Sequence, residues 1–305
     1  MLQYGRKVTV AFQGTGGGFA VNADGGTQDQ IRVAGTVIKG MSGTANTLEL
    51  EVYNLAEGNR GAVGKELDVV TVEAGYISIV DGSSNVGMIF KGEIRDVEHR
   101  REGPDIITKV TCGDGDKALR TAVKSKTYPA GTKASEIIED LHSEFEKQGI
   151  AKGEWKGIED LPTYKRPYSV CGSCKREMDT LGRSHRFHWS LQNEAMEIVK
   201  GNGFIQSSAY VTPTTGLIGI PTITDNGVKF RALLNPDIRP NRMVVVESET
   251  LEMNSEGGSY RVSEVVYQFD NRDGDFVVDV TAEKISGGYV DEGRIPLPAA
   301  ISENG

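Results

Sequence analysis

The sequence predicts a mainly β protein with an α/β insert, in which two related β-modules flank a small two-helix-plus-hairpin domain. Three observations predict this fold. Glycine supplies 38 of the 305 residues, above the roughly 7% average, and frequent glycine is typical of chains with many turns. Apolar and polar residues alternate toward both ends of the chain, as in half-buried strands. The middle of the chain instead shows apolar residues at helical spacing.

The first β-module is expected over residues 1–115. The alternation predicts six strands, around 8–12, 31–33, 48–52, 67–72, 90–97 and 106–112. Gly103-Pro104-Asp105 marks the hairpin turn between the last two strands. The segment 14–27 is rich in glycine, asparagine and aspartate, and we expect it to be a flexible hairpin loop.

The α/β insert is expected over residues 116–200. Thr132 is a good N-cap, and apolar residues recur at helical spacing from Ala134 to Phe145 until Gly149 ends the helix. A loop is predicted over about 150–168, and a second helix from Ser169 to Gly182. Its apolar stripe would consist of Val170, Cys174, Met178 and Leu181. Strands at 187–191 and 195–200, joined by a turn at 192–194, complete the insert.

The second β-module is expected over residues 201–285, because the sequence contains an internal repeat. A shift of 170 residues aligns Phe90–Cys112 with Tyr260–Ala282 without a gap. Upstream, Val70–Glu73 resembles Val244–Glu247, and the alternation at 48–52 matches that at 228–232. Strand order, phase and turn position agree, which favours a duplicated module over the chance alignment of two hairpins. Residues 286–305 show no periodicity and are expected to form an extended C-terminal tail.

Charge and composition exclude several classes of function. The net charge is −9 at pH 7, with a sequence pI near 5.1, and no Lys/Arg cluster suited to gripping nucleic acid is present. No apolar run approaches the length of a membrane span, and the start does not resemble a signal peptide. Three cysteines in a chain of this length imply no disulfide framework. We therefore expect synthesis and assembly in a reducing cytoplasm.

A zinc site is the sharpest chemical alternative. Cys171 and Cys174, followed by His185 and His188, form C-x2-C-x10-H-x2-H, which is short of zinc-finger spacing in both intervals. If His185 and His188 both belong to the strand around Phe187, their odd and even positions place their side chains on opposite faces. That arrangement suits one tetrahedral site poorly. We therefore expect Cys174 to pack in the core and the histidines to face solvent.

Other motifs also fall short of a catalytic or cofactor site. A thiol-redox role for Cys171 and Cys174 would require a preceding β-α-β pattern, and a papain-type site lacks its distant histidine. Gly14–Gly18 resembles a dinucleotide loop, but Phe19 stands where the third glycine is needed. Asp270–Asp275 resembles a calcium loop, but Arg272 occupies a ligand position. We expect no enzymatic activity, no cofactor, and no catalytic, cofactor-binding or metal-ligating residues.

The order of strands and turns resembles the baseplate hub family of contractile phage tails, which is related to late-control protein D and to the hub part of type VI secretion spikes. The first stretch is Thr47–Asn54, Val69–Gly75 and Phe90–Ile94 with the hairpin that follows. The second is Lys133–Gln148, then Ser169–Gly182 leading into Phe187–Trp189 and Ala195–Ile198. The third is Gly216–Pro221, Leu233–Pro236 and Arg242–Val246. Together they span most of residues 45–285 and are patterns of strands and turns.

The resemblance implies a fold, a location and partners. Such hubs are trimers with two tube-like β-barrels per chain, and they join a sixfold tail tube to a threefold central spike. It implies a virion tail baseplate protein that contacts the tube, a separate spike protein and other baseplate and tape-measure proteins. DNA would meet it only in non-specific transit during genome ejection. The alternatives are a β-rich carbohydrate-binding or adhesin-type module and, less favoured, a zinc or thiol protein that uses Cys171 and Cys174.

Overall fold

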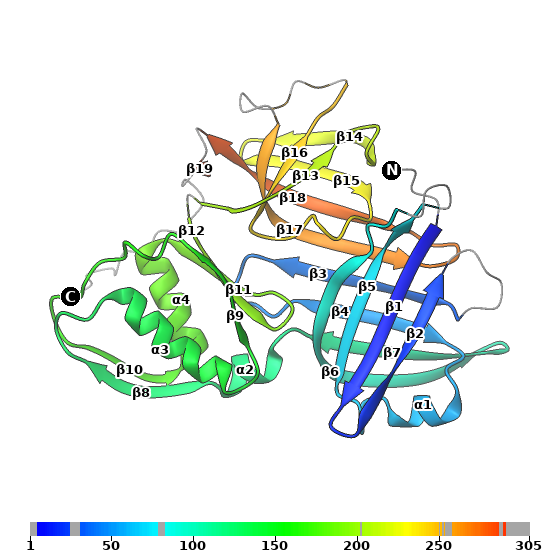
Figure 1. Cartoon of the computed structure of the whole chain (residues 1–305), viewed down its shortest axis with the longest axis horizontal. Helices are drawn as coiled ribbons and strands as arrows, with labels where there is room; N and C mark the ends of the chain where they lie inside the picture. The colour runs from blue at the N-terminus through cyan, green and yellow to red at the C-terminus, as the bar shows by residue number, and fades with distance from the viewer. Residues whose placement is uncertain are drawn as a thin grey trace, which may run out of the picture.

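The computed structural model describes residues 5–24, 31–78, 83–201, 203–249, 251, 253, 258–286 and 289–290. Most of the described chain is extended, and four helices interrupt it (Figure 1). The predicted mainly β fold with an α/β insert is confirmed. Nearly all of the predicted C-terminal tail, residues 286–305, lies outside the described residues.

The described part of the first module contains seven strands and one short helix. They are β1 (Gly5–Gly14), β2 (Gly17–Asp24), β3 (Val33–Gly40), β4 (Thr47–Tyr53), α1 (Glu57–Ala62), β5 (Val69–Ile77), β6 (Gly87–Glu102) and β7 (Asp105–Gly113). The second module contains β13 (Ile205–Val211), β14 (Leu217–Thr224), β15 (Gly227–Leu233), β16 (Arg242–Val246), β17 (Ser259–Asp270), β18 (Val277–Ser286) and β19 (Tyr289–Val290). The insert lies between them in sequence.

The insert combines three helices with five strands. They are α2 (Asp116–Thr121), β8 (Val123–Tyr128), α3 (Ala134–Glu146), β9 (Ala151–Lys156), β10 (Tyr168–Ser173), α4 (Cys174–His185), β11 (Phe187–Leu191) and β12 (Ala195–Lys200). β8 pairs with β10, and β11–β12–β9 form a second small sheet. Figure 1 shows this insert, in green, standing to one side of the large sheet, with its β11–β12 hairpin turned toward it.

The two modules share one 14-stranded sheet. Its main path runs β14-β15-β18-β17-β3-β4-β7-β6-β5-β1-β2, with β16 beside β17, β13 beside β16, and β19 beside β18. The modules meet where β17 pairs antiparallel with β3, from Glu264 opposite Gly40 to Asp270 opposite Ala34. The modules are thus joined by backbone hydrogen bonds as well as by the chain.

The buried side chains form two clusters. One draws on both modules and includes the alternating inward residues of their strands, such as Val8, Val10 and Phe12 of β1. The other lies within the insert, where the α3 residues Ile137, Ile138, Leu141 and Phe145 are fully buried. The segment boundaries at 115, 200 and 285 stay a prediction, and this division of the core supports the first two.

Strand register supports the duplication and corrects its alignment. Cys112 pairs with Ile94 and Leu48, and Ala282 pairs with Val262 and Val228. The 170-residue shift therefore holds for β7 and β18, but β6 matches β17 with a shift of 168, so that Ile94 corresponds to Val262. The ungapped alignment is wrong for β6, because its turn has two residues between Glu102 and Asp105. In that register the second hairpin has four residues between Asp270 and Asp275.

The expected loop at 14–27 is wrong for its first part. β1 and β2 form a tight hairpin in which Gly14 pairs with Gly17. Phe19 stacks on Phe12 with ring centroids 5.0 Å apart, and Val21 is buried. This alternating pattern gives β2 an inward face, which the high glycine content concealed. Residues 25–27 lie outside the described part of the chain.

The predicted start and end of the second insert helix are also wrong. Residues 168–173 form strand β10, in which Val170 is buried opposite Lys126. Gly172 has φ +111°, which excludes a helix there. Ser173 is the N-cap of α4, and its Oγ accepts a hydrogen bond from the Arg176 N–H at 3.4 Å. The helix continues past Gly182 to His185 and ends at Arg186, whose backbone is left-handed (φ 55°).

The loop predicted at 150–168 contains a further strand. β9 pairs parallel with β12, from Ala151 opposite Ala195 to Lys156 opposite Val199. Its glycine and lysines do not show the apolar alternation that marks a strand, and Trp155 supplies the one large apolar side chain. None of the described helices is both long and apolar enough to cross a membrane.

Candidate functional site

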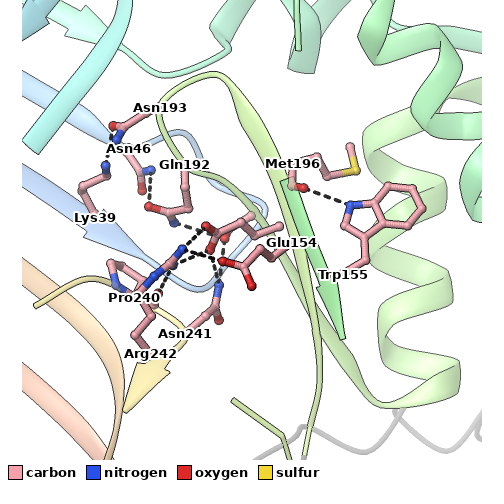
Figure 2. A network of polar contacts seen from close by, with 12 residues as sticks. Lys39, Asn46, Glu154, Trp155, Gln192, Asn193, Met196, Pro240, Asn241 and Arg242 are labelled. Carbon is pink, nitrogen blue, oxygen red and sulfur yellow. Dashed lines mark hydrogen bonds and ion pairs between the residues drawn. The ribbon is translucent and has the colours of Figure 1, made fainter. Parts of the chain in front are cut away.

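The most elaborate arrangement of polar groups is the junction where the insert meets both modules (Figure 2). It is built around the tip of the β11–β12 hairpin, a two-residue turn between Gln192 and Ala195. Asn193 and Glu194 both have positive φ, 57° and 62°, as a type I′ hairpin turn requires. Glutamate rarely adopts this conformation, so the surroundings must stabilise it.

Asp114 supplies that stabilisation from the end of the first module. Its carboxylate is fully buried and accepts the backbone N–H of Asn193 at 2.7 Å and that of Glu194 at 2.8 Å. The amide of Asn46 also donates to it at 3.2 Å. Burial raises the pKa of Asp114, and the nearby Lys39 ammonium and these N–H donors oppose that rise. The turn is therefore held by a carboxylate that accepts hydrogen bonds from its two backbone N–H groups.

Lys39 of β3 is a buried cation of the junction. Its ammonium donates to the carbonyl of Ile89 at 3.1 Å and to Asn193 Oδ1 at 2.6 Å. Burial lowers the pKa of Lys39 to about 8, and the Asp114 carboxylate acts in the opposite direction. At the rim, Lys91 of β6 forms an ion pair with Glu194 at 2.6 Å. The hairpin tip is thus bonded to strands β3 and β6 of the first module.

The same hairpin is bonded to the second module through a buried ion pair. Arg242 of β16 donates to both carboxylate oxygens of Glu197 on β12, at 2.9 and 3.0 Å. Asn241 donates to the same carboxylate at 3.3 Å, and the Pro240 carbonyl accepts from Arg242 at 3.2 Å. Figure 2 shows these groups converging from the insert and the second module. A two-point Arg–carboxylate pair fixes orientation as well as distance.

Both connections to the insert are held by arginines of the sheet. Arg95, at the irregular register of β6, pairs with Asp116 where the chain enters the insert. Arg261 of β17 donates to the carbonyls of Gly201 and Gly203 where the chain leaves it, at 3.0 and 2.9 Å. Arg261 is also paired with Glu283 at 2.6 Å. The insert is therefore fixed at its entry, its exit and its hairpin tip.

This junction has the properties of a contact that holds the insert on the sheet. Most of its groups are paired with one another and buried, which leaves little access for a substrate, although the buried Asn241 Oδ1 and Arg261 Nε atoms make no hydrogen bond. Replacing either partner of such a pair leaves an uncompensated buried charge. The arrangement therefore sets the angle between the insert and the sheet.

The four residues of the zinc hypothesis do not come together as a ligand set. Cys171 is exposed on β10, whereas Cys174 is fully buried at the start of α4. His185 lies at the end of α4, not on a strand, and its Nε2 is 2.9 Å from the Tyr164 hydroxyl. Burial lowers the pKa of His188 on β11 to about 4. Across the described ranges, no group of three or more His, Cys, Asp or Glu side chains is arranged to hold a metal ion.

The structure also argues against a thiol-redox role for Cys174. Cys174 stands at a helix N-terminus, where a thiolate would be favoured. Burial nevertheless raises the pKa of Cys174 to about 11. A buried thiol with a raised pKa is a poor nucleophile and packs as a small apolar residue.

The motifs that resemble a dinucleotide loop (Gly14–Gly18) and a calcium loop (Asp270–Asp275) both form turns between strands. Gly14 and Gly17 close the β1–β2 hairpin. Asp270 pairs with Arg32 at 2.6 Å, and Asn271 Oδ1 accepts the Val33 N–H at 2.8 Å. The turn at 271–274 thus attaches the β17–β18 hairpin to the start of β3.

Sequence reasoning missed the junction, although one signal was present. Lys39 lies in the inward phase of β3, two residues after the buried Val37. A lysine in that phase of an alternating strand must find partners inside the protein. Those partners, Ile89 and Asn193, lie 50 and 154 positions away along the chain, so local pattern could not identify them.

The fold has known counterparts, all of low sequence identity. The 43 kDa tail protein of prophage MuSo2 from Shewanella oneidensis is 7% identical with a TM-score of 0.60, over 91% of this chain and 97% of that one. The tail protein from Neisseria meningitidis MC58 is 9% identical with a TM-score of 0.59, over 92% and 97%.

A third counterpart comes from a secretion system. The E. coli c3393 protein is 12% identical with a TM-score of 0.58, over 90% of this chain and 79% of that one. It is described as a type VI secretion component similar to the T4 tail proteins gp27 and gp5. The fold of this chain is therefore shared with phage tail proteins and with a type VI secretion component. A comparison with curated protein sequences finds no significant match.

A family model then gives the narrower assignment. The model of the baseplate hub gp41 family matches residues 24–282, which is most of the chain. The chain belongs to this baseplate hub family. It is a structural protein of the phage tail baseplate hub type, as the resemblance in the sequence predicted.

Proposed function

We propose that three copies of this chain form a ring that adapts a sixfold tail tube to a threefold central spike. The duplicated module supports this proposal most strongly. Its strands β4, β5, β6 and β7 correspond to β15, β16, β17 and β18 in order and register. Three chains with two modules each present six similar units to the tube and three identical chains to the spike. Symmetric closure of this kind is the common solution for soluble oligomers.

The proposed ring has a tail tube protein on one side and a separate spike protein on the other. Other baseplate and tape-measure proteins would contact its periphery. The solved counterparts include a Francisella PdpA–VgrG complex, with a TM-score of 0.56 over 95% of this chain and 60% of that one. This likeness supports a place in an assembly with other proteins. We place the protein in the virion tail baseplate, with assembly in the host cytoplasm.

The proposed ring encloses a channel through which DNA passes without being gripped. The net charge of −9 supports passage, since like charge opposes retention of phosphate backbones. The protein acts as a scaffold and not as an enzyme. The paired and buried state of the junction supports this role.

The glycan-binding alternative is not favoured. Carbohydrate platforms present several exposed aromatic rings. Among the described residues, Tyr210 is the one large aromatic side chain with a high exposed fraction, 61%. A single ring does not make a platform.

Mass measurement tests the proposed ring. Native mass spectrometry of the purified chain, at rising concentration, should show a species of three times the 33.0 kDa chain mass. Averaged images of assembled tails should show threefold symmetry at the same level. A chain that remains monomeric at every concentration and is missing from purified tails would contradict the proposal.

A further inference from the structure

A hollow beside the junction lies between the first module and the insert. Its volume is about 430 Å³. Residues Met41–Gly43, which follow β3, form one wall, and the C-terminal half of α4 with the start of β11 forms the other. The walls meet at Gly43, where an added Cβ would stand 2.4 Å from the Trp189 indole. The hollow is thus bounded by two segments that are already in contact.

The lining of the hollow is apolar, with a cation at its edge. Met41, Phe187 and Trp189 supply the apolar part. Asp179 is already engaged, because it accepts from Trp189 Nε1 at 2.9 Å and pairs with a lysine of its own helix at 3.3 Å. Arg183 is exposed, its Nε donates to the Asp179 carbonyl at 3.2 Å, and no carboxylate of the described residues pairs with it. Such a hollow suits a segment that carries apolar side chains and carboxylates.

The C-terminal part of the second module lies beside this hollow. The Met41 N–H donates to the Ser263 carbonyl at 3.2 Å, and Ser263 Oγ donates to the Thr281 carbonyl of β18 at 2.9 Å. Burial lowers the pKa of His188, which lines the hollow, to about 4, and the nearby Glu283 carboxylate of β18 opposes this shift. Two residues of β18 are therefore close neighbours of the hollow.

The chain turns back toward the hollow after β18. β19 pairs antiparallel with β18, with Val290 opposite Ile285, so the chain at Val290 runs back in the direction of Thr281. Thr281 lies four residues before Ile285, which is about 13 Å along a strand. An extended stretch of five residues spans about 17 Å, which brings residue 295 within reach of the hollow. Figure 1 shows β19 at the side of the second module that is nearest the insert.

The sequence after β19 has the composition that the hollow favours. Residues 291–305 lie outside the described part of the chain. They begin with the two carboxylates of Asp291-Glu292 and continue to Ile295-Pro296-Leu297-Pro298, in which prolines alternate with large apolar residues. Prolines favour an extended segment and remove N–H donors that docking would otherwise leave without an acceptor.

We propose that residues 291–298 fold back within the same copy and bury the Ile295 and Leu297 side chains in this hollow. Arg183 attracts the carboxylates at the start of the segment. The short connection favours the chain's own segment over that of a second copy, since tethering sets a millimolar effective concentration. Because β19 belongs to the second module, the docked segment ties both modules and the insert together. This inference is independent of the proposed ring.

Disulfide crosslinking in the full-length chain tests the docking. In a Cys171→Ser background, which removes the exposed thiol, Ser42→Cys at the exposed edge of the hollow is combined with Ala299→Cys, next to the docked residues. Under mild oxidation we expect a disulfide within one chain, identified by mass spectrometry of proteolytic fragments. Arg176→Cys, which is exposed on α4 about 10 Å before Arg183, is the matched partner outside the hollow. Its crosslinking with Ala299→Cys should be at least about tenfold slower.

Amide exchange of the full-length chain provides a second readout. Leu297→Asp places a charge where the apolar hollow would have to bury it, so exchange at 41–45 and in β11 should accelerate about fivefold or more. Ser302→Asp, beyond the docked residues, carries the same added charge and should leave exchange there unchanged. Exchange in α3 should be equal in all three proteins, which shows that the insert remains folded.

The possible outcomes separate this inference from the proposed function. A fast disulfide between positions 42 and 299 of one chain, together with the local acceleration of exchange, supports the docking. The same disulfide formed between two copies overturns the assignment to a chain's own segment. Equal rates at positions 42 and 176, or exchange that Leu297→Asp leaves unchanged, overturn the docking itself. None of these outcomes depends on the trimer mass, so failure of the docking leaves the proposed ring standing.

Discussion

At the scale of single residues, the buried charges fix the orientation of the insert relative to the sheet. Asp114, Lys39, Glu197 and Arg242 are buried or nearly so, and each is matched by a partner from another segment. Such pairs add little net stability compared with apolar packing, but they penalise every arrangement in which the partners separate. The junction therefore favours one angle between insert and sheet.

Replacing Asp114 tests this role. Asp114→Leu should lower the free energy of unfolding by about 3–5 kcal/mol, since it leaves two turn N–H groups without their acceptor and removes the buried negative charge that offsets Lys39. Both tryptophans, Trp155 and Trp189, lie in the insert, so denaturant unfolding followed by their fluorescence reports on it. Asp237→Leu, at an exposed position, is the control and should change stability by less than about 0.5 kcal/mol. Equal effects of the two substitutions would contradict the assigned role.

A second carboxylate makes the insert sensitive to acid. Asp140 of α3 accepts hydrogen bonds from Lys124, Lys126 and Tyr128 of β8, at 3.0, 2.8 and 2.6 Å. Burial tends to raise the pKa of Asp140, but these bonds outweigh it and lower the pKa below the ordinary value. A depressed folded-state pKa stabilises the protein above the unfolded-state pKa of about 4, and this contribution is lost as the pH falls below it.

Asp140→Asn should therefore reduce stability at pH 7 by about 1–2 kcal/mol. The difference from the unsubstituted chain should shrink as the pH falls from about 5 toward 2. Thermal unfolding monitored across this range measures it, with the exposed Asp160→Asn as control. A difference that stays constant with pH would rule out ionisation of Asp140 as its origin.

At the scale of elements, the β17–β3 pairing determines how the modules sit. Gly35 of β3 lies beneath the ring of Phe269, and a Cβ there would stand 2.6 Å from both the Phe269 ring and the Glu49 carbonyl. The close approach of the two strands therefore needs glycine at this position. The four-residue turn after β17, held to β3 by Asn271, belongs to the same arrangement.

Gly35→Val should disturb this join specifically. We expect a loss of about 1–3 kcal/mol from overpacking, together with faster amide exchange along β3 and the second half of β17. Hydrogen exchange with mass spectrometry localises the effect. Gly16→Val, where an added Cβ meets no atom within 4 Å, should leave exchange in both strands unchanged. Uniform acceleration over the whole sheet would show that the join is not a local unit.

At the scale of the whole molecule, the net negative charge predicts that the chain does not bind DNA appreciably. At physiological salt, labelled duplex DNA should show no binding to the chain tighter than about 10⁻⁴ M, the weak end of ordinary non-specific binding. Fluorescence anisotropy measures this, with a basic DNA-binding protein as positive control. Micromolar binding that weakens steeply with salt would contradict a non-gripping channel.

The sequence predicted much of this architecture because strands and hairpins leave local signals. The alternation at 48–52 and 228–232 identified β4 and β15 and their correspondence. Failures arose where local pattern was ambiguous. Val170 lies four residues before Cys174, as in a helix, yet it belongs to a strand because Gly172 turns the backbone. Phe19 and Val21 were hidden among glycines.

The candidate site was largely beyond sequence reasoning. Lys39 and Asn193 meet only because the insert folds back on the sheet, and Asp114 looks like any turn residue. Pairings across more than a hundred residues depend on tertiary structure.

The pairing of β17 with β3 within one chain also bears on how a ring would be assembled. In the proposed ring of six modules, three of the six contacts between modules form during folding of the single polypeptides, at an effective concentration set by the chain and not by the protein concentration. Only the remaining three depend on encounters between molecules. Duplication and fusion of the module would thus reduce the encounters needed to assemble the ring from five, for six separate modules, to two for three chains, an advantage for a part present in few copies per particle.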